Sequence, residues 1–96
     1  MLFVATCIDK PDHLQTRLDN RPAHLAYLNG LGAKLKVAGA LLGPDNETPI
    51  GSMLIFDVAD QDEALKLVDD DPFGKVGLFE SISVKAWRQG VGAPLA

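Results

Sequence analysis

Two polar side chains, Arg21 and His24, occupy positions where a helix would normally carry apolar residues. Each residue turns a helix by about 100°, so Leu25, Leu28 and Leu31 form one apolar arc, and both polar side chains fall inside it. An imidazole can transfer protons near neutral pH, and a guanidinium can hold a carboxylate through two parallel hydrogen bonds. A core histidine that bonds a backbone carbonyl, with the arginine reaching the rim, fits the same pattern. The helix positions alone favour this second interpretation.

Three consecutive carboxylates, Asp69 to Asp71, precede Pro72 at the predicted end of a second helix. Carboxylates at a helix C-terminus face the negative end of the helix dipole, which costs a few tenths of a kcal/mol or more each. Proline pushes the preceding residue into extended backbone, so Asp71 is expected to leave the helix. The pattern fits an acidic turn in solvent, and it also fits one carboxylate that points inward to meet a partner.

The elements that must position these residues follow from apolar periodicity and turn residues. Pro22 suits a first helical position and Asn20 a cap before it, which predicts that the main helix begins there. Glu63 follows Asp60 at the spacing of a capping box, and Gly39 inside a strand predicts a bulge or a close backbone approach. Strands are predicted over 2–8, 35–42, 51–58 and 80–88, helices over 13–18, 21–29 and from 60 to about 70, and a loop or short turn over 74–77.

This order of elements predicts an α+β, ferredoxin-like βαββαβ fold, with a four-stranded antiparallel sheet and the helices on one face. The strand over 2–8 is apolar on both alternating sets, which is typical of a strand covered on both faces. The 96 residues make one domain, 1–96, and leave nothing to cover the second face. A second copy packed sheet against sheet is therefore expected. Residues 89–96 are predicted to form a loose tail or a segment that contacts the partner subunit.

The overall composition excludes several classes of function. A net charge of −4 and a pI near 4.9, without any basic run, argue against nucleic-acid binding. The apolar run over 2–8 is too short to span a membrane and follows no basic segment, so a cytoplasmic protein without membrane contact is expected. Cys7 is the single cysteine and is interpreted as a small buried apolar residue.

Four stretches of the chain resemble the YciI-like (YCII-related) family over nearly the whole length. The stretches are 21–25, Gly39, 71–73 and 80–85. The combination of Arg-x-x-His in the first with Asp-Pro-aromatic in the third is fairly specific to the family. The resemblance implies a dimeric ferredoxin-like α/β barrel, similar to muconolactone isomerase, with a His–Asp active site, here His24 and Asp71. Gly39 and Phe73, together with Arg21, are candidate substrate-binding residues. Tyrosine is also common in the family at the position of Phe73, so a role for that hydroxyl does not carry over.

The chemistry that this pair would perform is proton transfer. A carboxylate bonded to one imidazole nitrogen fixes the tautomer and raises the basicity of the other nitrogen. Some members of the family resemble lyases that eliminate halide from small ring-cleavage acids. We therefore expect elimination or isomerisation of a small, anionic organic acid by His24 and Asp71, with Arg21 holding its acidic group.

Two alternatives to an enzyme remain open at the level of sequence. One is a non-catalytic dimeric ligand-binding or accessory module that uses the same pocket. The other is a structural dimer in which Arg21, His24 and Asp71 form a buried polar network. An open pocket above His24 would favour a ligand. One histidine and one carboxylate supply too few ligands for zinc, and His13 is expected in solvent, so neither a metal nor a cofactor is expected.

Overall fold

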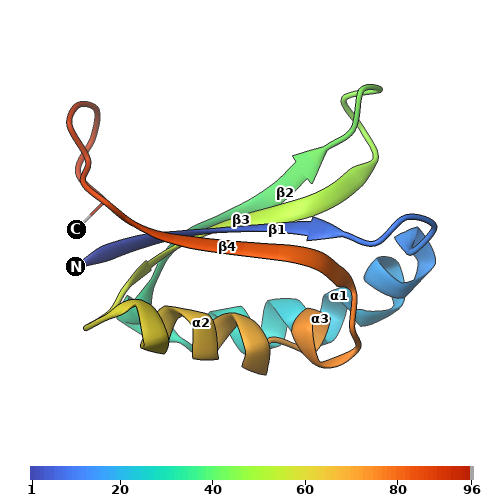
Figure 1. Ribbon diagram of the computed structural model, residues 1–96, viewed down its shortest axis with the longest axis horizontal. Helices are drawn as coiled ribbons and strands as arrows, with labels where there is room; N and C mark the ends of the chain where they lie inside the picture. The colour runs from blue at the N-terminus through green and yellow to red at the C-terminus, as the bar shows by residue number, and fades with distance from the viewer. Residues whose placement is uncertain (96) are drawn as a thin grey trace.

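The computed structural model describes residues 1–95 and has the predicted strand, helix, strand, strand, helix, strand order, with one further short helix after the second long one. The strands form one antiparallel sheet in the order β2-β3-β1-β4. All helices lie on one face of the sheet (Figure 1), which confirms the predicted ferredoxin-like fold. The elements are β1 (Leu2–Asp9), α1 (Leu14–Asn29), the 3-10 turn η1 (Gly32–Lys34), β2 (Leu35–Leu42), β3 (Pro49–Asp57), α2 (Gln61–Asp70), α3 (Pro72–Lys75) and β4 (Phe79–Trp87).

The core lies between the helices and the inward-facing side chains of the two central strands. Alternate residues of β1 point toward the helices, and Phe3, Ala5 and Cys7 are all buried there. Phe56 of β3 is fully buried beside them, and burying a side chain of this size contributes about 1.5–3 kcal/mol. The burial of Cys7 confirms its interpretation as a core residue.

Helix α1 begins seven residues before the predicted start, so Pro22 lies inside it and not at its first position. A proline inside a helix leaves the carbonyl four residues earlier without its helical donor, at a cost of about 3 kcal/mol. Three buried side chains offset this cost because Arg17, His24 and Leu28 lie on the same side of α1 and hold both halves against the protein. The predicted cap is also wrong, since Asn20 Nδ2 donates to the Thr16 carbonyl at 2.8 Å.

Several smaller features differ from the predictions. Gly39 pairs regularly with Met53, and the irregularities of β2 lie at its two ends, so the predicted bulge is wrong. The close backbone approach occurs instead at Gly51, where a Cβ atom would overlap the Cys7 carbonyl oxygen. Residues 74–77, predicted as a loop or short turn, include the end of the single-turn helix α3. The predicted cap of α2 is confirmed, because Asp60 Oδ1 accepts from the Glu63 N–H at 2.9 Å.

The face of the sheet opposite the helices is uncovered in the single chain. A shallow hollow of about 460 Å³ lies on this face and is lined mainly by Val4, Met53, Ile55 and Trp87. This is the surface that the predicted sheet-to-sheet dimer would cover, and the dimer stays a prediction. Among residues 1–95, no helix combines the length and the apolar character that crossing a membrane requires.

The C-terminal tail folds back on the side chain of Gln89. Its Nε2 donates to the Val91 carbonyl at 3.1 Å, and its Oε1 accepts from the Leu95 N–H at 3.0 Å. The tail forms a loop that projects beyond the sheet at the end where the N-terminus also lies (Figure 1). Residue 96 of the predicted tail lies outside the described residues.

Candidate active site

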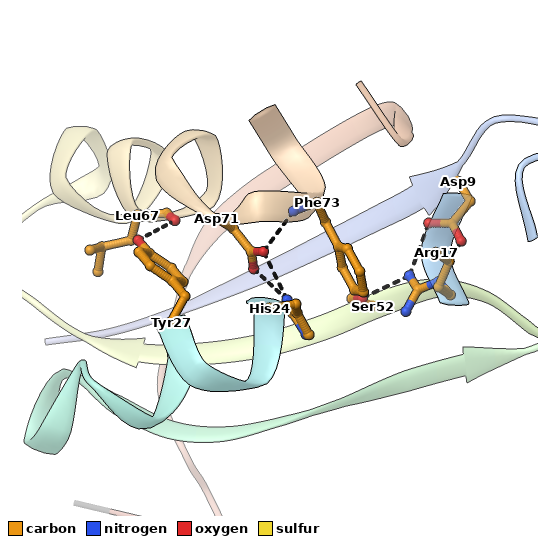
Figure 2. Close-up of polar contacts among 8 residues, drawn as sticks. All are labelled: Asp9, Arg17, His24, Tyr27, Ser52, Leu67, Asp71 and Phe73. Atoms are coloured by element: carbon orange, nitrogen blue, oxygen red, sulfur yellow. Dashed lines mark hydrogen bonds and ion pairs between the residues drawn. The ribbon is translucent and has the colours of Figure 1, made fainter. Parts of the chain in front are cut away.

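His24 and Asp71 contact each other where α1 passes the turn between α2 and α3. The Nδ1 atom of His24 lies 2.8 Å from both carboxylate oxygens of Asp71 (Figure 2). Both residues are buried, with 8% of His24 and 2% of Asp71 exposed. Because a carboxylate accepts hydrogen bonds, this contact assigns the proton of the neutral ring to Nδ1 and leaves Nε2 as the unprotonated atom.

The local sequence explains why Asp71, and neither of its acidic neighbours, reaches the histidine. Asp71 has φ −59° and ψ 136°, the extended backbone that the following proline requires, and this turns its side chain away from the axis of α2. Its Oδ1 also caps α3 by accepting from the Phe73 N–H at 2.9 Å. Asp69 is exposed, and Asp70 pairs with Lys66 at 3.0 Å on the surface.

The ring of Phe73 fixes the imidazole from the side. The two rings are stacked, with centroids 3.9 Å apart and planes 13° from parallel. The guanidinium carbon of Arg17 lies 4.7 Å from the same phenyl centroid. Arg17 precedes His24 by seven residues, or roughly 10 Å along the helix, so the two groups lie on opposite faces of the phenyl ring.

Arg17 belongs to a buried ion pair that the sequence analysis missed. Its Nε and Nη2 donate to the two oxygens of Asp9 at 2.6 and 2.9 Å, and Nη2 also donates to Ser52 Oγ at 2.9 Å (Figure 2). The bidentate geometry and the extra hydroxyl compensate the desolvation of both charges. A signal for Arg17 exists in its spacing of two helical turns from His24, but the prediction placed Arg17 in a separate helix over 13–18 and began the main helix at residue 21.

A cavity of about 140 Å³ opens beside the imidazole, between α1 and strand β2. Three residues predicted to bind substrate, Arg21, Gly39 and Phe73, line it together with His24. Arg21 lies at the exposed rim, in the middle of α1 and not at its positive end, and it forms no ion pair within residues 1–95. Gly39 contributes backbone only, because alternation along β2 directs its missing side chain to the opposite face of the sheet.

The Nε2 atom of His24 is open to this cavity. It has no hydrogen-bond partner among the described residues. Every fully buried side-chain nitrogen and oxygen among these residues has a partner, so Nε2 is not fully buried. Nε2 must therefore reach open space, and His24 lines the cavity. The arrangement can accept a proton from a bound molecule at Nε2 while the carboxylate stabilises the imidazolium that forms.

Comparison with known proteins identifies the family of this chain. Residues 1–88 match the YCII-related domain. The chain belongs to this family. It is 35% identical over 96 residues to Protein YciI of Escherichia coli, a match that covers 93% of this chain and 98% of the relative.

Solved structures of similar fold include a dehydrochlorinase. The chain is 42% identical to 5-chloro-2-hydroxyhydroquinone dehydrochlorinase from Burkholderia phenoliruptrix, solved with 2,5-dihydroxybenzoquinone, with a TM-score of 0.84 and coverage of 94% and 96% of the two chains. A protein from Agrobacterium tumefaciens aligns over the whole of both chains at 15% identity and a TM-score of 0.59, which shows the fold alone.

Two further side chains of this YCII-related domain support the site without entering it. The Tyr27 hydroxyl donates to the Leu67 carbonyl at 2.7 Å and so ties α1 to α2 (Figure 2), and burial raises its pKa to about 12. Burial, with the charges of Asp71 and Asp9 nearby, raises the pKa of the Cys7 thiol to about 12. A thiol held in this state is a poor nucleophile, which favours proton transfer over covalent catalysis at this site.

Proposed function

We propose that this protein is an enzyme that eliminates hydrogen halide from a small, hydroxylated ring compound, with His24 as the group that moves the protons. The observation that carries the proposal is the orientation of the imidazole, with Nδ1 on a buried carboxylate and Nε2 open to a cavity. The similarity to a dehydrochlorinase over nearly the full length supports the choice of reaction.

The size of the cavity fits such a substrate. An engineered protein cavity of about 150 Å³ accommodates benzene, so a space of about 140 Å³ accepts one six-membered ring and few substituents. The edge of the Phe73 ring and the aliphatic side chains of Leu25 and Leu28 on α1 provide apolar contacts for it. Arg21 at the rim would hold an anionic substituent that projects from the ring.

The proposed reaction begins with a tautomerisation, because chloride on an aromatic carbon has no easy path to leave. Nε2 takes the proton of a ring hydroxyl, whose electron pair forms a C=O bond, and the imidazolium returns the proton to the carbon that bears chlorine. This carbon is then tetrahedral. A second hydroxyl gives its proton to Nε2, its electrons move through the ring, and chloride leaves with the electron pair of the C–Cl bond. The net change is the loss of HCl, and no oxidant or reductant is required.

The test is the release of chloride from 5-chloro-2-hydroxyhydroquinone, measured for the wild type, His24→Gln and His13→Gln. General acid–base catalysis by one group contributes about 10²–10⁴ in rate, so His24→Gln is expected to lose that factor. His13→Gln is the matched control, because the His13 ring lies outside the cavity and bonds the Pro11 carbonyl at 2.7 Å. Equal rates in all three proteins would refute the role of His24. Binding without chloride release in the wild type would favour the non-catalytic module.

A further inference from the structure

The hydroxyl of Tyr27 forms a second contact between α1 and α2, beside the contact of His24 with Asp71. It donates to the Leu67 carbonyl at 2.7 Å (Figure 2). Tyr27 follows His24 by three residues on α1. Leu67 precedes Asp71 by four residues, so the members of each pair lie about one helical turn apart. The two contacts therefore hold the same stretch of α1 against the same end of α2.

The Leu67 carbonyl is available to Tyr27 because a proline follows α2. In a continuing α-helix the Leu67 carbonyl would accept from the Asp71 N–H, and the Val68 carbonyl would accept from the next residue. That next residue, Pro72, has no N–H, and the Asp71 N–H donates to the Val68 carbonyl at 3.3 Å, three residues earlier. The Tyr27 hydroxyl supplies a donor for the Leu67 carbonyl at this helix end.

The tightened last turn of α2 sets the direction in which the Asp71 carboxylate leaves the helix. A residue whose N–H donates three residues back advances by about 120° and 2.0 Å, against about 100° and 1.5 Å in an α-helix. A return to the wider turn would rotate Asp71 by roughly 20° and move it by roughly 0.5 Å along the axis. Both carboxylate oxygens lie 2.8 Å from His24 Nδ1, so a displacement of this size is enough to weaken the contact.

The Tyr27 hydroxyl is suited to hold this turn at every pH at which a histidine transfers protons. Burial, with the charges of Asp70 and Asp71 nearby, raises its pKa to about 12, so the donor proton stays in place. The ring is half-buried against the core, which limits the motion of the hydroxyl. A donor already bound to the Leu67 carbonyl reduces what the Asp71 N–H would gain by returning to it.

We propose that Tyr27 is a positioning residue: by holding the last turn of α2, its hydroxyl keeps the Asp71 carboxylate on His24 Nδ1. The consequence for chloride release rests on the proposed function, because Tyr27 lies outside the cavity lining and acts only through the two residues of the site. The consequence for the imidazole needs no ligand. A hydroxyl that served stability alone would join the helices without changing the tautomer of the ring, which is set by the hydrogen bond at Nδ1.

The test measures the tautomer of His24 from the ¹⁵N chemical shifts of its ring, without ligand and at a pH at which the ring is neutral. Tyr27→Phe removes the hydroxyl and keeps the aromatic ring. Replacement of Tyr27 by 4-aminophenylalanine restores a donor at the same place. Lys34→Met is the matched control, because it removes the 3.0 Å contact of Lys34 with Glu63, which joins the turn after α1 to the start of α2, away from the site.

We expect the ring protonated on Nδ1 to dominate in the wild type. Its ratio to the ring protonated on Nε2 should fall by roughly threefold to tenfold in Tyr27→Phe, the worth of about one hydrogen bond. The 4-aminophenylalanine variant should restore most of the ratio, and Lys34→Met should leave it unchanged. In the assay of chloride release, Tyr27→Phe should lower kcat severalfold and leave KM unchanged, because the hydroxyl does not line the cavity.

An unchanged ratio in Tyr27→Phe, or a reduced ratio that 4-aminophenylalanine fails to restore, would overturn the positioning role. An equal fall in Lys34→Met would also overturn it, because any loosening of the helices would then suffice. If Tyr27→Phe does not fold, the comparison is made between 4-aminophenylalanine and 4-fluorophenylalanine at this position. The fluorinated ring fills the space of the hydroxyl and donates no hydrogen bond, so the same difference in ratio is expected.

These outcomes are separate from the test of the elimination reaction, because the tautomer is measured without ligand or turnover. A ratio that depends on the Tyr27 hydroxyl, in a protein that releases no chloride, would support the positioning role and refute the proposed reaction. Chloride release that depends on His24, with the same ratio in the wild type and Tyr27→Phe, would do the reverse.

Discussion

The replacement of Asp71 by Asn tests how the site controls the histidine, and the structure dictates how the new amide must lie. In the wild type, Oδ1 accepts from the Phe73 N–H at 2.9 Å, and both oxygens lie 2.8 Å from His24 Nδ1. An amide has one oxygen and one NH₂ group. The oxygen must face Phe73, because an NH₂ group there would oppose an N–H donor. The amide oxygen and the amide nitrogen then both lie 2.8 Å from Nδ1.

This orientation removes the carboxylate's control of the His24 tautomer, because Nδ1 then faces a donor and an acceptor at the same distance. The NH₂ group favours a ring with its proton on Nε2, and that ring has no lone pair facing the cavity. The replacement also removes the negative charge that stabilises the imidazolium, and a hydrogen bond to a charged group contributes about 1.5–3 kcal/mol. The lost charge alone predicts a loss of 10-fold or more in rate, and the mixture of tautomers adds to it.

The assay measures both the rate of chloride release and the tautomer, the latter from the ¹⁵N chemical shifts of the His24 ring. Asp71→Asn should lose about 10-fold or more in rate and populate the tautomer with its proton on Nε2. Asp69→Asn and Asp70→Asn are matched controls, because they remove the same charge within two residues and contact the ring in neither case. Since Asn can still cap α3, a folded variant is expected. Equal small effects from all three variants would mean a diffuse acidic field and would refute the specific contact.

Three further predictions test other parts of the interpretation. Arg21→Lys should weaken the binding of benzoate, measured by calorimetry, by about fivefold or more because lysine lacks the planar fork, whereas equal affinity would exclude Arg21 as the carboxylate anchor. Cys7 should resist iodoacetamide at pH 8 until the protein unfolds. Because the folded protein raises the pKa of Cys7 from 9.0 to about 12, the contribution of this thiol to the free energy of unfolding should be complete below pH 9 and lost as pH rises toward 12. The variant Cys7→Ala should not show this loss of stability. Sedimentation at low micromolar concentration should show a dimer, and Met53→Glu should dissociate it. Leu42→Glu should leave the dimer intact, because Leu42 is exposed and lies outside the hollow of the uncovered sheet face. A stable wild-type monomer would refute the sheet-to-sheet dimer.

The four strands and the start of α2 were predictable because local sequence patterns mark them. Alternating apolar residues define the strands, and Asp60 with Glu63 marks the start of α2 by side-chain chemistry that needs no tertiary contact. The start of α1 was not predictable in this way, because Pro22 is typical of a helix N-terminus. Only the burial of Arg17, whose partner Asp9 lies on a different element, reveals why the helix continues through the proline.

The candidate site was predictable in its members more than in its contacts. Helix periodicity singled out His24, and Pro72 singled out Asp71 among three carboxylates. Their proximity depends on how α1 packs against the turn before α3, and sequence spacing gives no measure of that packing. Ser52 carried no signal, because a serine in a strand is ordinary and its partner Arg17 lies 35 positions away. The resemblance to the family supplied the pairing of His24 with Asp71 that periodicity could not.

The two buried polar groups of the site share an asymmetry that argues for a ligand. His24 meets Asp71 through one nitrogen, and Arg17 meets Asp9 through one edge, so the cost of burying each group is offset on the side away from the cavity. The atoms Nε2 of His24 and Nη1 of Arg17 have no hydrogen-bond partner within residues 1–95, and both residues line the cavity. A network with only a structural role gains nothing from this arrangement, because its stability increases with each donor and acceptor that finds a partner in the protein.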